Sequence, residues 1–414
     1  MKTVLKTFYK SNYKSNYKSK SNYKSNYKSK TNYKSYYKSK NLNKAVTAIC
    51  LAASLFTASS ASAIAPLSVS ANASLYVSAK ASLYVSAKAS VATPTVTPAV
   101  TNSAQLEIKE WQVPWPKTRP RDPAVDSNGI VYFCGQKGNY IASLDPKTGE
   151  FKQFTLPDNT HPHNLIIDKN NMIWYAGNRN NHIGKLNPND GSIEKIMMPG
   201  KIEIDPHTLI FNKQGDIWFT AQWGNQVGRL TTSTGKVDLI DMKIAHARPY
   251  GIKMSAQNIP YVVLFGTNKV AKINVDDLSF SLIDLPDANE RPRRLEITST
   301  DLLYYLDHKT GYLGEIDLNT EQITKYAMPE GNKAKLYGSA MDSNNRIYVA
   351  LTGIKPVKIR VFDSKTKQLI AEADVPSGGG SVRYMYYHQA SDEVWFGSDA
   401  NTVGVIKLIQ QAKD

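Results

Sequence analysis

The chain has 414 residues and a formal net charge of +16 at pH 7. Fifteen lysines, and no acidic residue or arginine, lie in residues 1–104, which leaves a charge of +1 for the rest of the chain. A nucleic-acid-binding domain is expected to carry a basic face of its own, so the near-neutral body argues against nucleic acid as a partner. The body contains a single cysteine, Cys134, and a single cysteine cannot form an internal disulfide.

Residues 1–63 are predicted to be a low-complexity basic extension followed by a signal peptide. Residues 11–40 repeat Ser-Asn-Tyr-Lys without apolar periodicity, so they cannot build a core. This repeat is interpreted either as an inert extension, which we favour, or as a basic tail that contacts an anionic polymer or a membrane. Ala45–Phe56 is a short apolar run, and small residues precede a cleavage site near Ala63. We therefore expect export to the periplasm or the medium, with no stable membrane insertion.

Residues 64–104 are predicted to be a disordered linker rich in Ala, Ser, Thr and Pro. The sequence Ala-Ser-Leu-Tyr-Val-Ser-Ala-Lys occurs at 73–80 and again at 81–88, and a Thr-Pro-rich stretch follows at 91–98. Such a composition is typical of a flexible or semi-rigid spacer.

From residue 105 to the end, one phrase recurs seven times at steps of 42 to 46 residues. It is clearest at His163–Leu186 and His207–Leu230, where a short apolar strand, a turn, an aromatic strand, an Asn and a third strand follow one another. A period of this length with four strands per unit is typical of a β-propeller blade. We predict an all-β fold, a seven-bladed β-propeller of four-stranded antiparallel blades over residues 105–414.

The last copy, from about Gly378 to Leu408, contains three strands. Leu106–Pro114 resembles the fourth strand of other copies, so we predict that this N-terminal strand completes the last blade. Because a closed ring leaves no free sheet edge at the seam, the protein is expected to be a monomer.

The first polar position of each copy is predicted to line an axial funnel, because the loops before the innermost strands gather around the axis. These positions are Arg121, His163, His207, Tyr250, Arg293, Tyr337 and Arg383. Arginine binds carboxylate and phosphate oxygens in a forked geometry, so a small oxygen-rich or anionic ligand is expected there. The alternative is that these side chains bond to neighbouring loops and plug the channel.

A second ring is expected fourteen residues further on, at the exit of each second strand. Its predicted members are Gly135, Gly177, Ala221, Leu264, Asp307, Leu351 and Ser398. Gln222 and Trp223 follow one of them, and both are expected at the opening. His163 and His207 belong to neighbouring copies and are expected to meet at the mouth.

The phrase Pro-His-x-ϕ-x-ϕ … Ile-Trp-Phe-Thr … Asn-x-ϕ-Gly-Arg-Leu, where ϕ is apolar, resembles the repeat of the virginiamycin B lyases over about residues 106–410. The resemblance implies a seven-bladed propeller with a magnesium ion that opens a cyclic depsipeptide of the streptogramin B type by elimination across an ester C–O bond. It implies His163 and His207 as catalytic residues. A Glu is implied fourteen residues after the second His, where this sequence has Ala221.

Two functions therefore remain open. The protein either binds a small ligand in the funnel without catalysis, because the Glu is replaced, or it is an active carbon–oxygen lyase. Elimination requires a base and an acid, and the loss of one of them costs about 10²–10⁴-fold in rate. The sequence leaves the metal ligands unknown.

Overall fold

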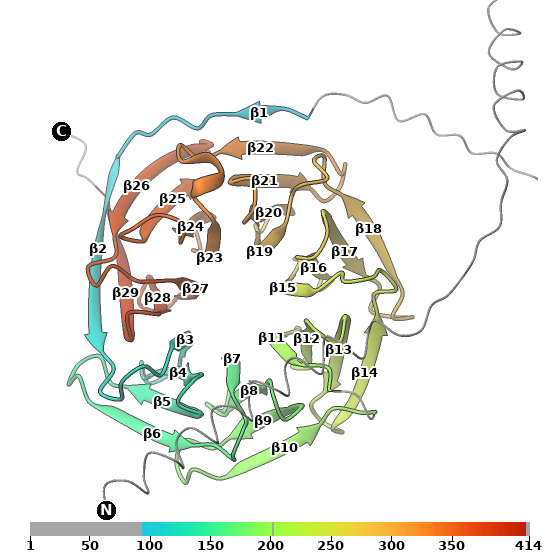
Figure 1. The fold of residues 1–414 in the computed structure, drawn as a ribbon, viewed down its shortest axis with the longest axis vertical. Helices are drawn as coiled ribbons and strands as arrows, with labels where there is room; N and C mark the ends of the chain where they lie inside the picture. The colour runs from blue at the N-terminus through green and yellow to red at the C-terminus, as the bar shows by residue number, and fades with distance from the viewer. Residues whose placement is uncertain (1–92, 201–202, 411–414) are drawn as a thin grey trace, which may run out of the picture. The chain divides into compact units, whose positions relative to one another are not determined.

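The computed structural model describes residues 93–200 and 203–410. The extension, the signal peptide and most of the predicted linker lie outside these residues. Seven sheets surround a central opening, and the first strand of each copy of the repeat is innermost (Figure 1). The predicted seven-bladed, all-β fold is confirmed. Within the described ranges, no helix is long and apolar enough to cross a membrane.

The blades follow one another along the chain, and their strand bounds are these. Blade 1 contains β3 (Pro120–Val125), β4 (Val131–Gly135), β5 (Tyr140–Leu144) and β6 (Phe151–Thr155), and blade 2 contains β7 (Pro162–Ile167), β8 (Ile173–Gly177), β9 (His182–Leu186) and β10 (Ile193–Met197). Blade 3 contains β11 (Pro206–Phe211), β12 (Ile217–Ala221), β13 (Gln226–Thr231) and β14 (Lys236–Asp241), and blade 4 contains β15 (Pro249–Met254), β16 (Pro260–Leu264), β17 (Lys269–Ile273) and β18 (Phe280–Asp284).

The remaining blades have the same plan. Blade 5 contains β19 (Pro292–Ile297), β20 (Leu302–Asp307), β21 (Tyr312–Asp317) and β22 (Ile323–Ala327). Blade 6 follows a short 3-10 turn, η1 (Gly331–Lys333), and contains β23 (Leu336–Met341), β24 (Arg346–Leu351), β25 (Lys358–Asp363) and β26 (Gln368–Asp374). Blade 7 contains β27 (Val382–His388), β28 (Glu393–Ser398), β29 (Thr402–Gln410) and β2 (Ala104–Gln112).

Packing between blades explains why the second strand of each copy is the most apolar. β12 is buried along its whole length, because one face meets blade 2 and the other meets blade 4. Phe219 packs with Trp174 of blade 2, while Trp218 packs with Val262 of blade 4. The fourth strands lie at the rim and are more exposed, as in β6, where Phe154 is the one buried residue.

The N-terminal strand closes the ring, as predicted. β2 pairs antiparallel with β29 over nine residue pairs, from Ala104↔Gln410 to Gln112↔Thr402. The indole ring of Trp111 stacks on that of Trp395 with centroids 5.6 Å apart. The carboxylate of Glu110 accepts hydrogen bonds from the amide and hydroxyl of Ser377 in blade 6, at 2.7 and 2.8 Å. Backbone pairing, ring stacking and a link to the neighbouring blade therefore all hold the seam.

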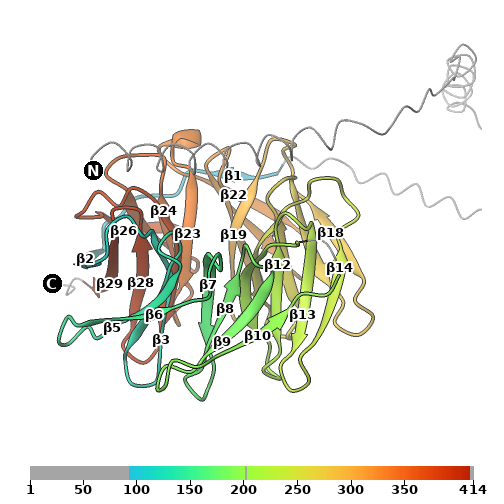
Figure 2. The ribbon, with the colours of Figure 1, turned by 60° about the horizontal axis from the view of Figure 1, so that its bottom comes forward.

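Residues 93–103 differ from the expected disordered linker. β1 (Thr95–Val96) pairs in parallel with β22, so blade 5 gains a fifth strand (Figures 1 and 2). Further on, the amide of Leu369 in β26 donates to the carbonyl of Ala99, and the amide of Thr101 donates back to Leu369, both at 2.9 Å. The outer strands of the blades present unpaired backbone groups, and this segment pairs with them. The propeller thus begins near residue 93.

Truncated chains separate the contribution of residues 93–103 to the stability of the fold from the contribution of β2. A chain that begins at Ala104 keeps β2, so we expect it to fold with a slightly lower melting temperature. A chain that begins at Trp115 exposes the edge of β29 and loses the Trp111 stack, so we expect it to lose cooperative unfolding. Thermal denaturation followed by circular dichroism measures both, and equal melting curves for the two chains would contradict the assigned closure.

Blades 1 and 2 have different side chains at one equivalent buried position, the first residue of the third strand. In blade 1, the hydroxyl of Tyr140 beside Phe133 donates to Thr118 at 2.8 Å. In blade 2, a fully buried His182 takes this place, and its Nε2 lies 3.4 Å from the hydroxyl of Tyr175. Burial lowers the pKa of His182 to about 4. The folded state favours the neutral imidazole, so it loses stability as the pH falls from about 6.5 towards 4.

The double variant Tyr175→Phe/His182→Tyr copies blade 1, since Thr160 and Gly177 already match Thr118 and Gly135. As the pH falls below about 6.5, we expect the free energy of unfolding of this variant to fall less steeply than that of the wild type. The two slopes should differ by up to about 1.4 kcal/mol per pH unit. Denaturant titrations at about pH 8 and about pH 5 measure this difference. The single variant Tyr175→Phe keeps the imidazole and should retain the acid sensitivity. An unchanged slope in the double variant would assign the acid sensitivity to other groups.

Candidate functional site

A cavity of about 270 Å³ opens at the ring axis. All seven predicted leading residues line it: Arg121, His163, His207, Tyr250, Arg293, Tyr337 and Arg383. Gln222 and Trp223 line it as well, and Trp223 is 68% exposed at the rim. The structure therefore brings together every residue that the sequence analysis placed in the funnel.

A bulge at the start of each innermost strand aims these side chains. In blade 3 the pairing with the second strand shifts by one residue between Pro206 and Leu209, and blades 2 and 4 show the same shift. An extra residue at a bulge redirects the side chains around it. His207 consequently lines the cavity, while Thr208 beside it receives a hydrogen bond from the buried guanidinium of Arg294 at 3.1 Å.

The second ring was predicted one residue too early. Ala221 is fully buried in the apolar cluster with Ile204 and Phe219, and the following residue, Gln222, lines the cavity. Every residue of the predicted ring is buried: Gly135, Gly177, Ala221, Leu264, Asp307, Leu351 and Ser398. The residues one position later, Gln136, Asn178 and Gln222, line the cavity, and Phe265, His308 and Asp399 contact its arginines. Alternate residues of a strand face opposite sides of the sheet. An error of one position therefore names a residue that faces the core in place of the one that faces the cavity.

The rings of His163 and His207 are in contact, with centroids 3.7 Å apart and planes tilted by 39°. Nδ1 of His163 lies 3.2 Å from the carbonyl oxygen of His207, and since a carbonyl can only accept, this nitrogen carries the proton. Burial and the neighbouring Arg121 lower the pKa of His163 well below 6.5. Burial and Arg294 do the same for His207. Both imidazoles are therefore neutral at pH 7 and can accept a proton.

Two tyrosines form a hydrogen bond beside this histidine pair, and the Tyr250 ring centroid lies 4.2 Å from that of His207. The hydroxyls of Tyr250 and Tyr337 are in contact, and the guanidinium of Arg293 lies 3.5 Å from the centroid of the Tyr337 ring. Burial by itself raises the pKa of Tyr250. The positive charges of Arg293, Arg294 and Arg121 outweigh burial and bring the pKa down to about 8. Tyr250 can therefore lose its proton close to neutral pH.

Arginine dominates the charge of the cavity. Arg121 pairs with Asp122 at 2.9 Å, and Arg383 pairs with Asp399. Arg248 has no carboxylate partner among the described residues; it stacks over the exposed Trp223 at 4.5 Å. With its amide oriented to satisfy its neighbours, Gln222 accepts from Arg248 at 2.6 Å. The wall therefore offers guanidinium groups that are not fully neutralised.

Sequence reasoning missed an outer ring of residues two positions before the leading slots. Arg119, Asp205 and Arg248 line the cavity, and their φ angles are 54°, 65° and 53°. Such angles are uncommon outside glycine and mark local strain at a functional surface. Extending the alignment of the copies by two residues would have found them, because these positions also carry polar or charged side chains.

Asp205 differs from the other members of this outer ring. Burial raises its pKa to about 8, and its Oδ2 has no hydrogen-bond partner among residues 93–200 and 203–410. Asp205 therefore favours its neutral, protonated form close to neutral pH, and it lines the same cavity as the two imidazoles.

The residues present do not fit magnesium. Within the described chain, no group of three or more His, Cys, Asp or Glu side chains is placed to hold a metal ion. Asp205 is the one carboxyl group among the residues that line the described cavity, beside five arginines. Magnesium prefers several oxygen ligands and is repelled by nearby cations, so no step of the chemistry is assigned to it.

Comparisons with known proteins agree with this architecture. Residues 93–358 match the model of the virginiamycin B lyase family. A selenomethionine-substituted virginiamycin B lyase from Staphylococcus aureus has a similar structure, with a TM-score of 0.66, 20% identity and coverage of 73% of this chain and 100% of that chain. No curated protein matches the sequence.

Two further solved structures are similar. A streptogramin B lyase has a TM-score of 0.66 at 22% identity, with coverage of 73% of this chain and 98% of that chain. A catalytically inactive virginiamycin B lyase from Staphylococcus aureus with quinupristin has a TM-score of 0.67 at 20% identity, with coverage of 73% and 100%. At these identities the likeness shows the fold.

Tyr250 offers a direct test of the electrostatics of the cavity. Near-ultraviolet absorbance should show one tyrosinate forming with a midpoint of about 8. The variant Tyr250→Phe should lose this transition. Tyr261→Phe is the matched control, because burial raises the pKa of Tyr261 to about 12 and its removal should leave the transition in place. A transition that persists in Tyr250→Phe would show that the arginines do not act on this phenol.

Proposed function

Because the chain belongs to the virginiamycin B lyase family, we propose that it uses the propeller to bind a small anionic or oxygen-rich ligand in the axial funnel. One observation carries this proposal. Arg121 is 3% exposed, it lies in the cavity wall, and its Nη2 has no hydrogen-bond partner among the described residues. An unmet buried donor costs about 1–3 kcal/mol, and more for a charged group, and an oxygen of a ligand would remove that cost.

The charge balance supports the same ligand class. Five arginines line the cavity: Arg119, Arg121, Arg248, Arg293 and Arg383. Asp122 and Asp399 offset part of this charge, and the protonated Asp205 offsets none of it. A concave, partly closed site with excess positive charge concentrates anions. Trp223 and Arg248 at the rim provide a surface for a planar group.

Catalysis is the second candidate, and the histidine pair favours it. Elimination removes a proton from the carbon beside a carbonyl, breaks the C–O bond and protonates the departing oxygen. A neutral imidazole of His163 or His207 would take the first proton, and the carboxylic acid of Asp205 would supply the second. On this reading, the substrate is an ester within a cyclic depsipeptide.

We also propose that the protein is exported and acts as a monomer on small molecules rather than on nucleic acid. The signal-peptide pattern that ends near Ala63 and the near-neutral body support this placement.

Citrate is a suitable anionic probe for the funnel. We expect calorimetry to show binding that weakens as salt is added, because exposed charges are screened. The variant Arg248→Gln should weaken binding roughly tenfold, since it removes a charged donor without leaving a carboxylate unpaired. Lys243→Gln, an exposed change in the same region, should have no effect. Undetectable citrate binding, or equal binding by Arg248→Gln, would refute the anion site.

Quinupristin separates binding from catalysis. Elimination leaves the mass unchanged and opens the ring, so chromatography with mass spectrometry distinguishes it from hydrolysis, which adds water. We expect the wild type to leave quinupristin intact and Gln222→Glu, tested with and without magnesium, to gain ring opening. Ala221→Glu is the control, because it places a carboxylate in an apolar cluster and should mainly destabilise the fold. Wild-type ring opening that is lost in His207→Ala would establish the lyase instead.

A further inference from the structure

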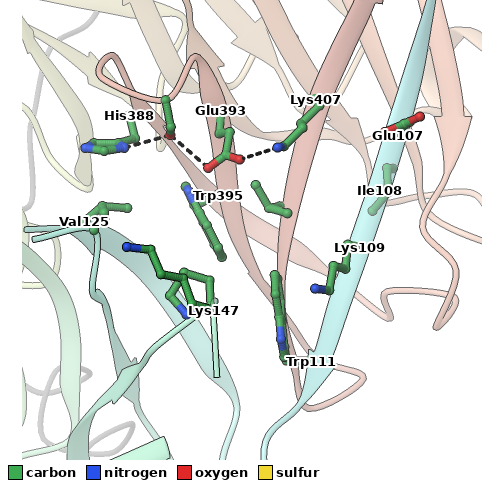
Figure 3. A pocket seen from close by; sticks show the side chains of 14 residues that line it. Glu107, Ile108, Lys109, Trp111, Val125, Lys147, His388, Glu393, Trp395 and Lys407 are labelled. Carbon is green, nitrogen blue, oxygen red and sulfur yellow. Dashed lines mark hydrogen bonds and ion pairs between the residues drawn. The ribbon is translucent and has the colours of Figure 1, made fainter. Parts of the chain in front are cut away.

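A second and larger concavity lies away from the funnel, at the seam between blades 7 and 1 (Figure 3). It has a volume of about 780 Å³, within the range of small-molecule sites. Its apolar wall contains Trp111 of β2, Trp395 of β28 and Val405 of β29, with Val125 and Pro146 contributed by blade 1. We refer to it as the seam groove.

The seam groove is larger than its counterpart of about 540 Å³ beside Trp174, and at this position blade 7 differs from blades 2 and 3. In blade 2, the ammonium of Lys185 lies 5.0 Å from the ring centroid of Trp174, and blade 3 covers its own tryptophan with an arginine. Blade 7 has Val405 opposite Trp395 instead. The short side chain leaves open space, and the indole ring of Trp111 from the N-terminal strand covers part of Trp395.

The groove wall contains a buried donor without a partner. In blade 2, the indole N–H of Trp174 donates to Asp168 at 2.9 Å. Trp395 is 2% exposed, and its indole N–H, like that of Trp218 in blade 3, has no acceptor within residues 93–200 and 203–410. A ligand oxygen reaching this N–H would satisfy it.

The charges of the groove are segregated (Figure 3). Glu393 and Lys407 pair at 2.9 Å, and Glu107 faces Lys407 across the strand pair, so these charges offset one another at one end. Lys109 and Lys147 lie on either side of the tryptophans, and neither forms an ion pair with a described carboxylate. The end that holds the tryptophans is therefore positively charged.

We propose that the seam groove binds a small hydrophobic carboxylate, an aryl or alkyl chain that ends in a carboxylate group. The chain packs against Val405, Pro146 and the edge of Trp111, whose two faces are covered. The carboxylate accepts from the indole N–H of Trp395 and from the ammonium of Lys147. An amine would be repelled by the two lysines, and an alcohol would lack the charge that they attract. A sugar would find both faces of Trp111 occupied, by Trp395 and by Lys109 at 4.4 Å.

The probe is 4-phenylbutyrate, with 4-phenylbutanol and 4-phenylbutylamine as neutral and cationic counterparts. Nuclear magnetic resonance of the indole N–H groups reports binding at individual tryptophans, and Trp395→Phe assigns the relevant signal. We expect the Trp395 signal to shift and saturate with the carboxylate. The alcohol and the amine should bind roughly tenfold more weakly or worse. No shift with the carboxylate, or equal binding of the alcohol, would overturn the proposal.

Four variants locate the site. Val405→Lys copies blade 2 and should weaken binding by narrowing the groove, and Lys147→Gln should weaken it roughly fivefold. Lys169→Gln is the matched control, because Lys169 lies in the corresponding groove beside Trp174. Arg248→Gln alters the funnel and should leave binding unchanged. Binding that survives both groove variants, or that depends on Arg248, would refute the seam groove independently of the proposed function of the funnel.

Discussion

The ring depends on one interaction, the antiparallel pairing of β2 with β29. Six blades are each built from consecutive strands, and the seventh is completed by a segment nearly three hundred residues away in sequence. Without this ladder the circle of sheets would have a free edge, and the innermost strands would not be held around one axis. The contact between His163 and His207 and the hydrogen bond between Tyr250 and Tyr337 both need that fixed circle, since each pair joins different blades.

In the funnel, one set of arginines shifts the pKa values of several acidic and basic side chains together. Arg121 and Arg294, with burial, keep the two imidazoles neutral, and with Arg293 they lower the pKa of Tyr250. Burial has the largest effect on Asp205, and it raises the pKa of this carboxyl group although Arg121 acts in the opposite direction. The site therefore holds neutral bases, a neutral acid and excess positive charge at once. Such a combination suits an anionic ligand. It does not suit magnesium, which needs several oxygen ligands around it.

Much of this could be predicted from the sequence, because the repeat fixes both the blade count and the seven leading positions. The second ring could not be placed reliably, since strand alternation turns a one-residue error into a change of face, as Ala221 and Gln222 show. Asp205 and Arg248 were missed because the compared copies began two residues later, and composition does not reveal the left-handed backbone at these positions. The path of residues 93–103 depends on free strand edges, which exist only in the assembled ring.

Both sites occur where a copy departs from its neighbours. Blades 2 and 3 cover their central tryptophans with a cation, whereas blade 7 places Val405 there and the N-terminal strand supplies Trp111. The axial positions likewise vary in side chain while the surrounding strands keep their register. A repeat scaffold gains stability from packing between neighbouring copies, so positions that do not take part in that packing can change without loss of the fold. In this molecule, those positions are the funnel and the seam, and it is there that ligand chemistry can differ from that of other propellers with the same ring.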